Sequence, residues 1–330
     1  MDSKTRLFVA IAVAVSSVGA VSARAATPDS GHDGFQPGEG FVYTFSVGAI
    51  DAGRARIAVG LPVRSKGKRL VAVQAEARSA PWLALLAKLE DTYKVILDAD
   101  SLRPSSVESI ARGFREHQVR LQLDGQKVFI DFHNAKVTSK GMHTIVKAPV
   151  DLIAALFMVR AAPLVDGDSF EMYVFDGGAL YKSNIKTAGR EQVTYEGQKV
   201  RAIHVDIVAT RVDDAGRPLG QPLRHGQIWL TDDERRVPFK ALGDTDLGPC
   251  DVDLVAYQRS SAPRLHGNAT ALRSTGASPS DQFAPAVVQL RVPSMVTTPS
   301  PKPAVAAPAP NLFPPAFRTP PTPVLTNAAR

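Results

Sequence analysis

The chain has 330 residues, of which 44% are hydrophobic and 22% are charged, a composition typical of a globular protein with a sizeable core. Its formal charge of +7 arises in residues 1–25 and 261–330, so residues 26–260 are neutral overall. A neutral central region argues against a nucleic-acid-binding domain, which needs a concentrated basic face, and the one cysteine, Cys250, excludes an internal disulfide.

The first 25 residues have the layout of a cleaved secretory signal peptide. Two basic residues precede an apolar run over residues 7–21, and Ala23 and Ala25 occupy the two small positions before a cleavage site. The alternative is a membrane anchor, but the run is shorter and richer in Ala, Ser and Gly than a span of about 20 strongly apolar residues. We therefore predict an exported, periplasmic protein with no transmembrane segment after signal cleavage.

Most of the central region predicts short β-strands joined by tight turns. Apolar and polar residues alternate over residues 41–47 and 52–59, which is the period of a half-buried strand. Asp124 and Gly125 separate two alternating runs and predict a hairpin with a primed turn. Further strands are expected at residues 70–75, 93–97, 118–123, 127–132, 170–175, 179–187, 192–195, 200–208, 227–230, 237–242 and 252–258. So many strands with such short turns indicate an antiparallel barrel or a strongly curved sheet.

Two apolar segments interrupt the strand pattern and predict short helices. Residues 81–91 begin with a proline, and in residues 149–160 Pro149 stands just before a predicted N-cap at Asp151. Both segments are apolar on nearly every side, which is more than packing of one face against a sheet requires. They either fill the interior of the sheet or line a cavity for an apolar ligand, and both interpretations stay open. The candidate lining residues of such a cavity are Trp82, Leu85, Leu86, Leu89, Leu152, Leu156 and Phe157.

The chain lacks the usual motifs of catalytic and metal sites. It contains no phosphate-binding glycine loop, no G-x-S-x-G elbow and no H-E-x-x-H, and its seven histidines are scattered. We therefore predict no metal and no cofactor, and favour a protein that is not an enzyme. The weak candidates for catalysis are three polar residues near predicted strand ends, Asp233, Glu191 and His225.

The stretch WLTDDERRVPFK, residues 229–240, contains three acids beside two arginines and raises the question of a carboxylate pair. Glycosidases hold two carboxylates on opposite sides of a bound sugar, about 5 to 9 Å apart. Neighbouring residues such as Asp232 and Asp233 splay apart, and the adjacent arginines keep the acids ionised. Because Asp also favours the first position of a tight turn, we predict that these acids form the tip of a hairpin.

Residues 261–330 contain more than half of the 25 prolines and hardly any acids. Such a segment cannot bury enough apolar surface to offset its ordering entropy, so the sequence predicts a disordered, basic tail. The expected organisation is a signal peptide at 1–25, a short linker at 26–36, one β domain at 37–260 and the tail at 261–330.

Four stretches, in this order and spacing, are similar to those of a known family: GEGFVYTFSVGAIDAGRARIAV, PVDLIAALFMVRAAPLVDGDSFEMYVFDGG, GREQVTYEGQKVRAIHV and IWLTDDERRVPFK. They resemble an uncharacterised family of exported bacterial proteins, domain-of-unknown-function family 3108, over about residues 37–258. The resemblance implies a curved antiparallel sheet or half-barrel with helices inside its concave face, a shape similar to that of periplasmic carriers of lipoprotein acyl chains. The family carries no established activity.

The fold class expected from residues and resemblance together is mainly β: a curved antiparallel sheet or incomplete barrel, two short apolar helices on its concave face, and the proline-rich tail. The expected function is a non-catalytic periplasmic binding or assembly protein that holds a lipid, lipoprotein or glycolipid of the cell envelope on that face. The alternatives are an envelope enzyme acting on cell-wall or lipid substrates, and a scaffold that docks through its tail. The protein partners are not readable from the sequence.

Overall fold

The computed structural model describes residues 34–84, 88–113, 116–220, 223–245 and 248–259. The predicted signal peptide, most of the predicted linker, the predicted tail and the candidate residues Leu85 and Leu86 lie outside these residues. No helix in the described ranges is long and apolar enough to cross a membrane.

The first half of the domain consists of β1 (Gly40–Val47), β2 (Ile50–Val59), β3 (Val63–Ser65), β4 (Lys68–Ser79), α1 (Pro81–Ala84), β5 (Leu89–Asp98), β6 (Pro104–Gly113), β7 (His117–Asp124), β8 (Lys127–Asn134) and β9 (Thr138–Thr144). The second half consists of α2 (Leu152–Ala161), β10 (Ser169–Phe175), β11 (Leu180–Tyr195), β12 (Gln198–Val212), β13 (Arg224–Thr231), β14 (Pro238–Thr245) and β15 (Gly248–Gln258).

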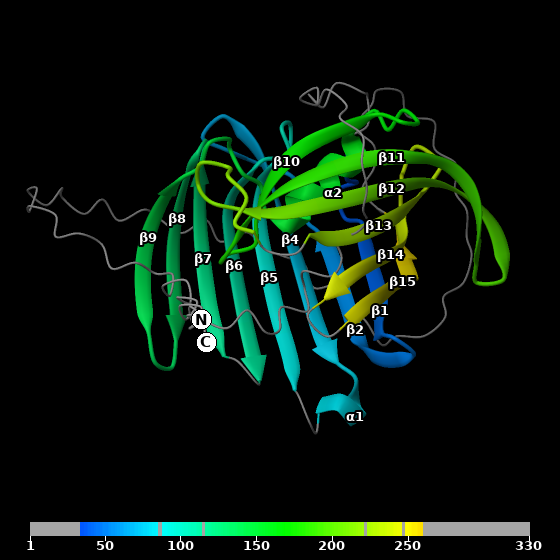
Figure 1. Cartoon of the computed structure of the whole chain (residues 1–330), viewed down its shortest axis with the longest axis horizontal. Coiled ribbons are helices and arrows are strands. Elements are labelled where there is room, and N and C mark those ends of the chain that lie inside the picture. Colours follow the sequence, from blue (N-terminus) through cyan, green and yellow to red (C-terminus); the bar gives the residue numbers. More distant parts are fainter. Residues whose placement is uncertain (1–33, 85–87, 114–115, 221–222, 246–247, 260–330) are drawn as a thin grey trace, which may run out of the picture. The chain divides into compact units, whose positions relative to one another are not determined.

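All of the described strands belong to one antiparallel sheet (Figure 1). Their order is β10-β11-β12-β13-β14-β15-β1-β2-β4-β5-β6-β7-β8-β9, and β3 pairs with β4 alone. The path has two ends, β10 and β9, so the sheet does not close into a barrel. Consecutive strands are neighbours almost throughout, because tight turns join antiparallel strands directly. The expectation of a mainly β, incompletely closed barrel is confirmed.

Alternation along each strand builds the core. In β1 the aromatic residues Phe41, Tyr43 and Phe45 are all buried, whereas the residues between them are half-buried. A bulge between Phe45 and Ser46 bends the β1–β2 pair. At this bulge Gly53 has φ +156°, and a side chain there would collide with the Arg78 carbonyl, so only glycine fits.

Helix α2 lies inside the bend of the sheet, where β10–β13 pass across β2–β5 (Figure 1). Of its 10 residues, 8 are buried, among them Ala154 and Phe157 at 0% exposure. This burial explains why the segment is apolar on nearly every side, since a helix enclosed by a curved sheet has no solvent face.

Helix α1 is much shorter than the expected helix at residues 81–91. Its described residues are Pro81–Ala84, residues 85–87 lie outside the described ranges, and residues from Leu89 onward form β5, which pairs with both β4 and β6. The ladder hydrogen bonds to two neighbours outweigh the helical propensity of this leucine-rich segment.

Candidate functional site

The C-terminal end of α2 is fixed by a buried ion pair. Arg160, which is 2% exposed, meets Glu39 in a two-pronged contact with N–O distances of 2.7 Å and 3.1 Å. The guanidinium carbon of Arg160 also lies 5.4 Å from the centre of the Phe41 ring and 5.6 Å from that of Phe157. Arg suits this place because its planar fork matches a carboxylate and its faces stack on aromatic rings.

The turn between β13 and β14 receives this end of the helix. Arg160 donates to the backbone carbonyls of Arg235 and Arg236 at 2.8 Å and 3.1 Å. In return, the Arg236 side chain donates to the carbonyls of Arg160, Ala162 and Pro163, which have no partner within the helix. The two arginines therefore lock the WLTDDERRVPFK turn to the last turn of α2.

The N-terminal end of α2 is fixed by Asp151. This fully buried carboxylate accepts hydrogen bonds from the backbone N–H groups of Ile153 and Ala154 and from the Tyr93 hydroxyl, the last at 3.0 Å. It is the N-cap that the sequence predicts. Burial raises the pKa of the Asp151 carboxyl to about 6, against the effect of these hydrogen bonds.

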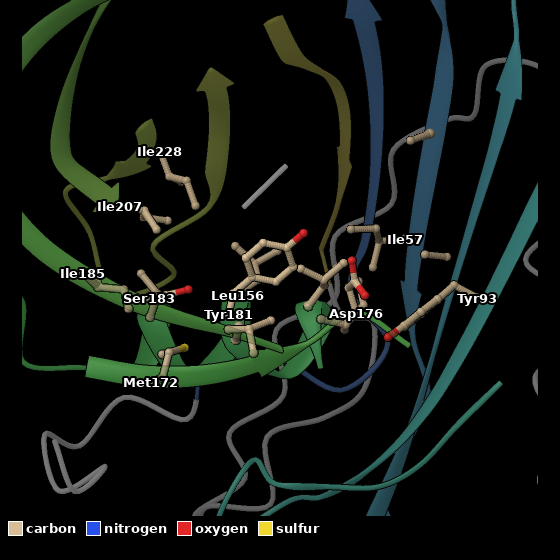
Figure 2. Close-up of a pocket in the computed structure, with 17 residues that line it drawn as sticks. Ile57, Tyr93, Leu156, Met172, Asp176, Tyr181, Ser183, Ile185, Ile207 and Ile228 are labelled. Carbon is tan, nitrogen blue, oxygen red and sulfur yellow. The ribbon is translucent and has the colours of Figure 1, made fainter. Parts of the chain in front are cut away.

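A pocket lies between α2 and the concave face of the sheet. It has a volume of about 60 Å³ and is open on one side. Figure 2 shows Ile185, Ile207 and Ile228 at one end and Asp176 with Tyr93 at the other. The lining residues, which come from α2, β2, β4, β5 and β10–β13, are Ala55, Ile57, Ala75, Tyr93, Leu152, Ile153, Ala155, Leu156, Val159, Met172, Val174, Asp176, Tyr181, Ser183, Ile185, Ile207 and Ile228.

Only a few polar groups reach this pocket. Asp176 is the one charged lining residue, and its Oδ1 accepts from the backbone N–H groups of Gly178 and Ala179 in the β10–β11 turn. The Tyr93 hydroxyl donates to Asp151. Ser183 is the only polar residue among the lining residues of β11–β13 besides Tyr181. The pocket is therefore an apolar slot with a polar end, a form that suits an amphipathic molecule.

The family model of DUF3108, described as a protein of unknown function, matches residues 42–255. The chain belongs to DUF3108. The match includes every strand that lines the pocket, and α2. No curated protein matches this chain.

Three solved structures match this DUF3108 chain at low identity. A β-barrel-like protein of DUF1849 from Brucella abortus is 10% identical with a TM-score of 0.47, covering 69% of this chain and 100% of its own. A protein described as exported, with a YmcC-like fold, from Bacteroides fragilis is 8% identical with a TM-score of 0.33, covering 68% and 97%. A protein described as a lipoprotein, from Parabacteroides distasonis, is 8% identical with a TM-score of 0.32, covering 69% and 99%.

The structure separates the predicted lining residues of this DUF3108 protein. Leu152 and Leu156 line the pocket. Phe157 is fully buried on another side of α2, and Leu89 packs at the edge of the core at the start of β5. Trp82 is 48% exposed in α1.

The three weak catalytic candidates stand in different places. Asp233 accepts hydrogen bonds from the Thr231 hydroxyl and from the Arg235 side chain in the β13–β14 turn. Glu191 accepts from the Trp229 indole at 2.6 Å and lies 3.3 Å from His204 Nδ1 on one face of the sheet. His225 lies six residues before Thr231 on β13, on the order of 20 Å from the turn. Within the described ranges no three His, Cys, Asp or Glu side chains are arranged to hold a metal.

Sequence reasoning did not single out the β-strand half of the pocket. Ser183, Ile185, Ile207 and Ile228 line the slot, but they come from strands that the sequence reads only as core. A signal was present in β11, where residues 181, 183, 185 and 187 share one face. Three of them, Tyr181, Ser183 and Thr187, carry hydroxyl groups, and Ser183 and Thr187 are buried. Two hydroxyls on the buried face of a strand mark a surface that is not pure core.

Proposed function

We propose that this DUF3108 protein is a non-catalytic periplasmic binding or assembly protein that holds an apolar or amphipathic envelope component in the slot beside α2. The observation that carries the proposal is the slot itself, an open apolar pocket with one polar end. Protein interiors contain few voids larger than a water molecule, and empty space lined by apolar groups is costly. An apolar occupant from the envelope would fill it.

The rigidity of α2 supports a site that exists before its ligand arrives. The helix is fixed at its N-terminal end by Asp151 and Tyr93, and at its C-terminal end by Arg160 and Arg236. The α2 wall of the slot is therefore held in place, which lowers the entropy cost of binding.

The size of the slot limits which molecules can occupy it. Its volume of about 60 Å³ is well under the roughly 150 Å³ of an apolar cavity that binds benzene. The slot accordingly suits a short segment of one thin hydrocarbon chain, and the remainder of a lipid, lipoprotein or glycolipid would lie outside it.

Filling the slot tests the proposal. Ala155 lines the pocket from α2, and Ala155→Phe places a large ring in the free space. Protein purified from its own periplasm should carry a lipid component that mass spectrometry identifies, and the Phe variant should have lost it. The matched control is Ala135→Phe, at an exposed position in the β8–β9 turn. A wild-type protein that is folded, carries nothing and binds no fluorescent apolar dye would overturn the proposal.

A further inference from the structure

Ser183 places a hydroxyl group inside the apolar slot. The residue is 3% exposed, and its neighbours across the sheet are Met172 on β10 and Ala209 on β12. Figure 2 shows its side chain among Leu156, Ile185 and Met172. A serine at this place is unexpected, because the paired residues on the two neighbouring strands, Met172 and Ala209, are both apolar.

The Ser183 hydroxyl has no hydrogen-bond partner among the residues that the structure describes. Among the described residues, the fully enclosed side-chain atoms without a hydrogen-bond partner are Asp91 Oδ1 and His204 Nε2. The Ser183 oxygen is not one of them, so it is not fully enclosed and retains contact with the free space of the slot. The Tyr93 hydroxyl, at the other end of the slot, donates to Asp151. A buried hydroxyl without a partner is costly, and each such group in a native protein requires an explanation.

We propose that Ser183 forms a hydrogen bond with an oxygen atom on the chain bound in the slot. This inference rests on the proposed function and specifies its ligand: a single hydrocarbon chain that bears a hydroxyl or carbonyl group part-way along its length. The ligand then supplies the hydrogen bond that the protein does not make. A carbonyl oxygen on the chain can accept from the serine, and a hydroxyl group can accept or donate.

The position of Ser183 sets the depth of that oxygen. Ser183 pairs with Met172, four residues before Asp176 at the polar end, so the two sites are on the order of 13 Å apart along the strand. A head group held at the polar end would not reach Ser183. The oxygen that Ser183 binds therefore belongs to the interior of the chain.

Matched ligands and a single-atom variant test this inference. The probes are methyl stearate and three isomers that carry one added hydroxyl near the ester, at the middle of the chain or beyond the middle. Their affinities are measured by displacement of a fluorescent apolar dye from wild type, from Ser183→Ala and from the control Ser139→Ala on β9, outside the slot. In wild type and in the control, one isomer should bind at least about tenfold more tightly than methyl stearate, because a matched hydrogen bond is worth about that factor.

In Ser183→Ala that preference should fall to within about twofold, and methyl stearate itself should bind at least as tightly as to wild type, because the unpaired hydroxyl is gone. A merely structural serine would weaken all four ligands alike. If all four ligands bind wild type equally and Ser183→Ala changes no affinity, the hydrogen-bond partner of Ser183 is a water molecule. In that case this inference fails while the proposed function stands. If none of the four binds and periplasmic protein is also empty, the proposed function fails first. Ser183→Thr, which keeps the hydroxyl, should retain the preference and guards against a folding defect of the alanine variant.

Discussion

Asp151 is 0% exposed, although burying an ionised carboxyl group is costly. Burial raises its pKa from 3.8 to about 6, and hydrogen bonds from Ile153, Tyr93 and Ala154 act in the opposite direction. Because the pKa in the folded state lies above that in the unfolded state, its contribution to stability is fully present below about pH 4 and is lost as the pH rises through 6. Deprotonation of a buried acid thus weakens the fold in the neutral range.

Asp151→Asn should remove this dependence on pH. Asparagine still caps a helix. Its one side-chain oxygen can accept from Ile153 and Tyr93, which share Oδ2 of Asp151, whereas the weaker bond from Ala154 to the second oxygen is lost. The difference in unfolding free energy between wild type and variant should change by about 2 kcal/mol between pH 4 and pH 7, with wild type relatively more stable in acid. Urea titrations at a series of pH values measure it. Asp124→Asn, at an exposed hairpin position, should leave the difference constant, and a constant difference for Asp151→Asn as well would refute the argument.

At the scale of elements, the turn from β13 to β14 binds the C-terminal end of α2. Arg236 has φ +46°, a strained conformation for a residue other than glycine. Its guanidinium group nevertheless binds three carbonyl groups around the end of the helix. The strain is offset by these hydrogen bonds, which a glycine would lose.

Arg236→Ala should therefore destabilise the protein by about 1–3 kcal/mol, because the backbone stays equally strained and buried carbonyls lose their donors. Hydrogen exchange should accelerate at the C-terminal end of α2 in particular. Arg235→Ala provides the comparison, because the half-buried Arg235 side chain pairs with Asp233 in the same turn and donates to no carbonyl of α2 among the described residues. Its cost should stay under about 1 kcal/mol. Equal unfolding midpoints in urea for the two variants would count against the role of Arg236.

The strands that alternate clearly could be predicted from the sequence, and those that do not could not. Residues 41–47 and the Asp124-Gly125 hairpin appear where expected, as β1 and the β7–β8 pair. Strand β9 was missed, since its sequence TSKGMHT has no apolar alternation and it gains its place by pairing with β8. The helix expected at residues 81–91 was too long because its leucines favour helix locally, whereas strand pairing decides.

The sequence pointed to the α2 side of the pocket but not to its β side, and the reason lies in topology. Leu152 and Leu156, which lie at the pocket, were candidates because an all-round apolar helix has to pack on several sides. Ser183 and Ile207 were not found, because their role depends on β10–β13 bending across β2–β5 (Figure 1). Local sequence patterns do not contain that bend, which follows from the order of all the strands in one sheet.

At the scale of the whole molecule, the described chain begins and ends in the middle of its own sheet. β1 pairs with β15, so Gly40 lies opposite Gln258, and the sheet has no continuous centre until the last strand is in place. Pairing between residues so distant in sequence is slow to form and makes folding cooperative. The two halves of the sheet, and with them the two walls of the slot, are joined through this pair and through α2.

A chain that ends at Thr245 should therefore have no cooperative unfolding transition. It loses β15, leaves one side of β1 and of β14 without hydrogen bonds, and uncovers the buried aromatic residues of β1. A chain that ends at Arg259 keeps every described strand and should unfold at the same urea concentration as the full-length protein. Circular dichroism against urea compares the three chains. If the chain ending at Thr245 unfolds cooperatively with the full-length midpoint, β2–β9 form a self-sufficient unit, and the β1–β15 pair does not join the two walls of the slot.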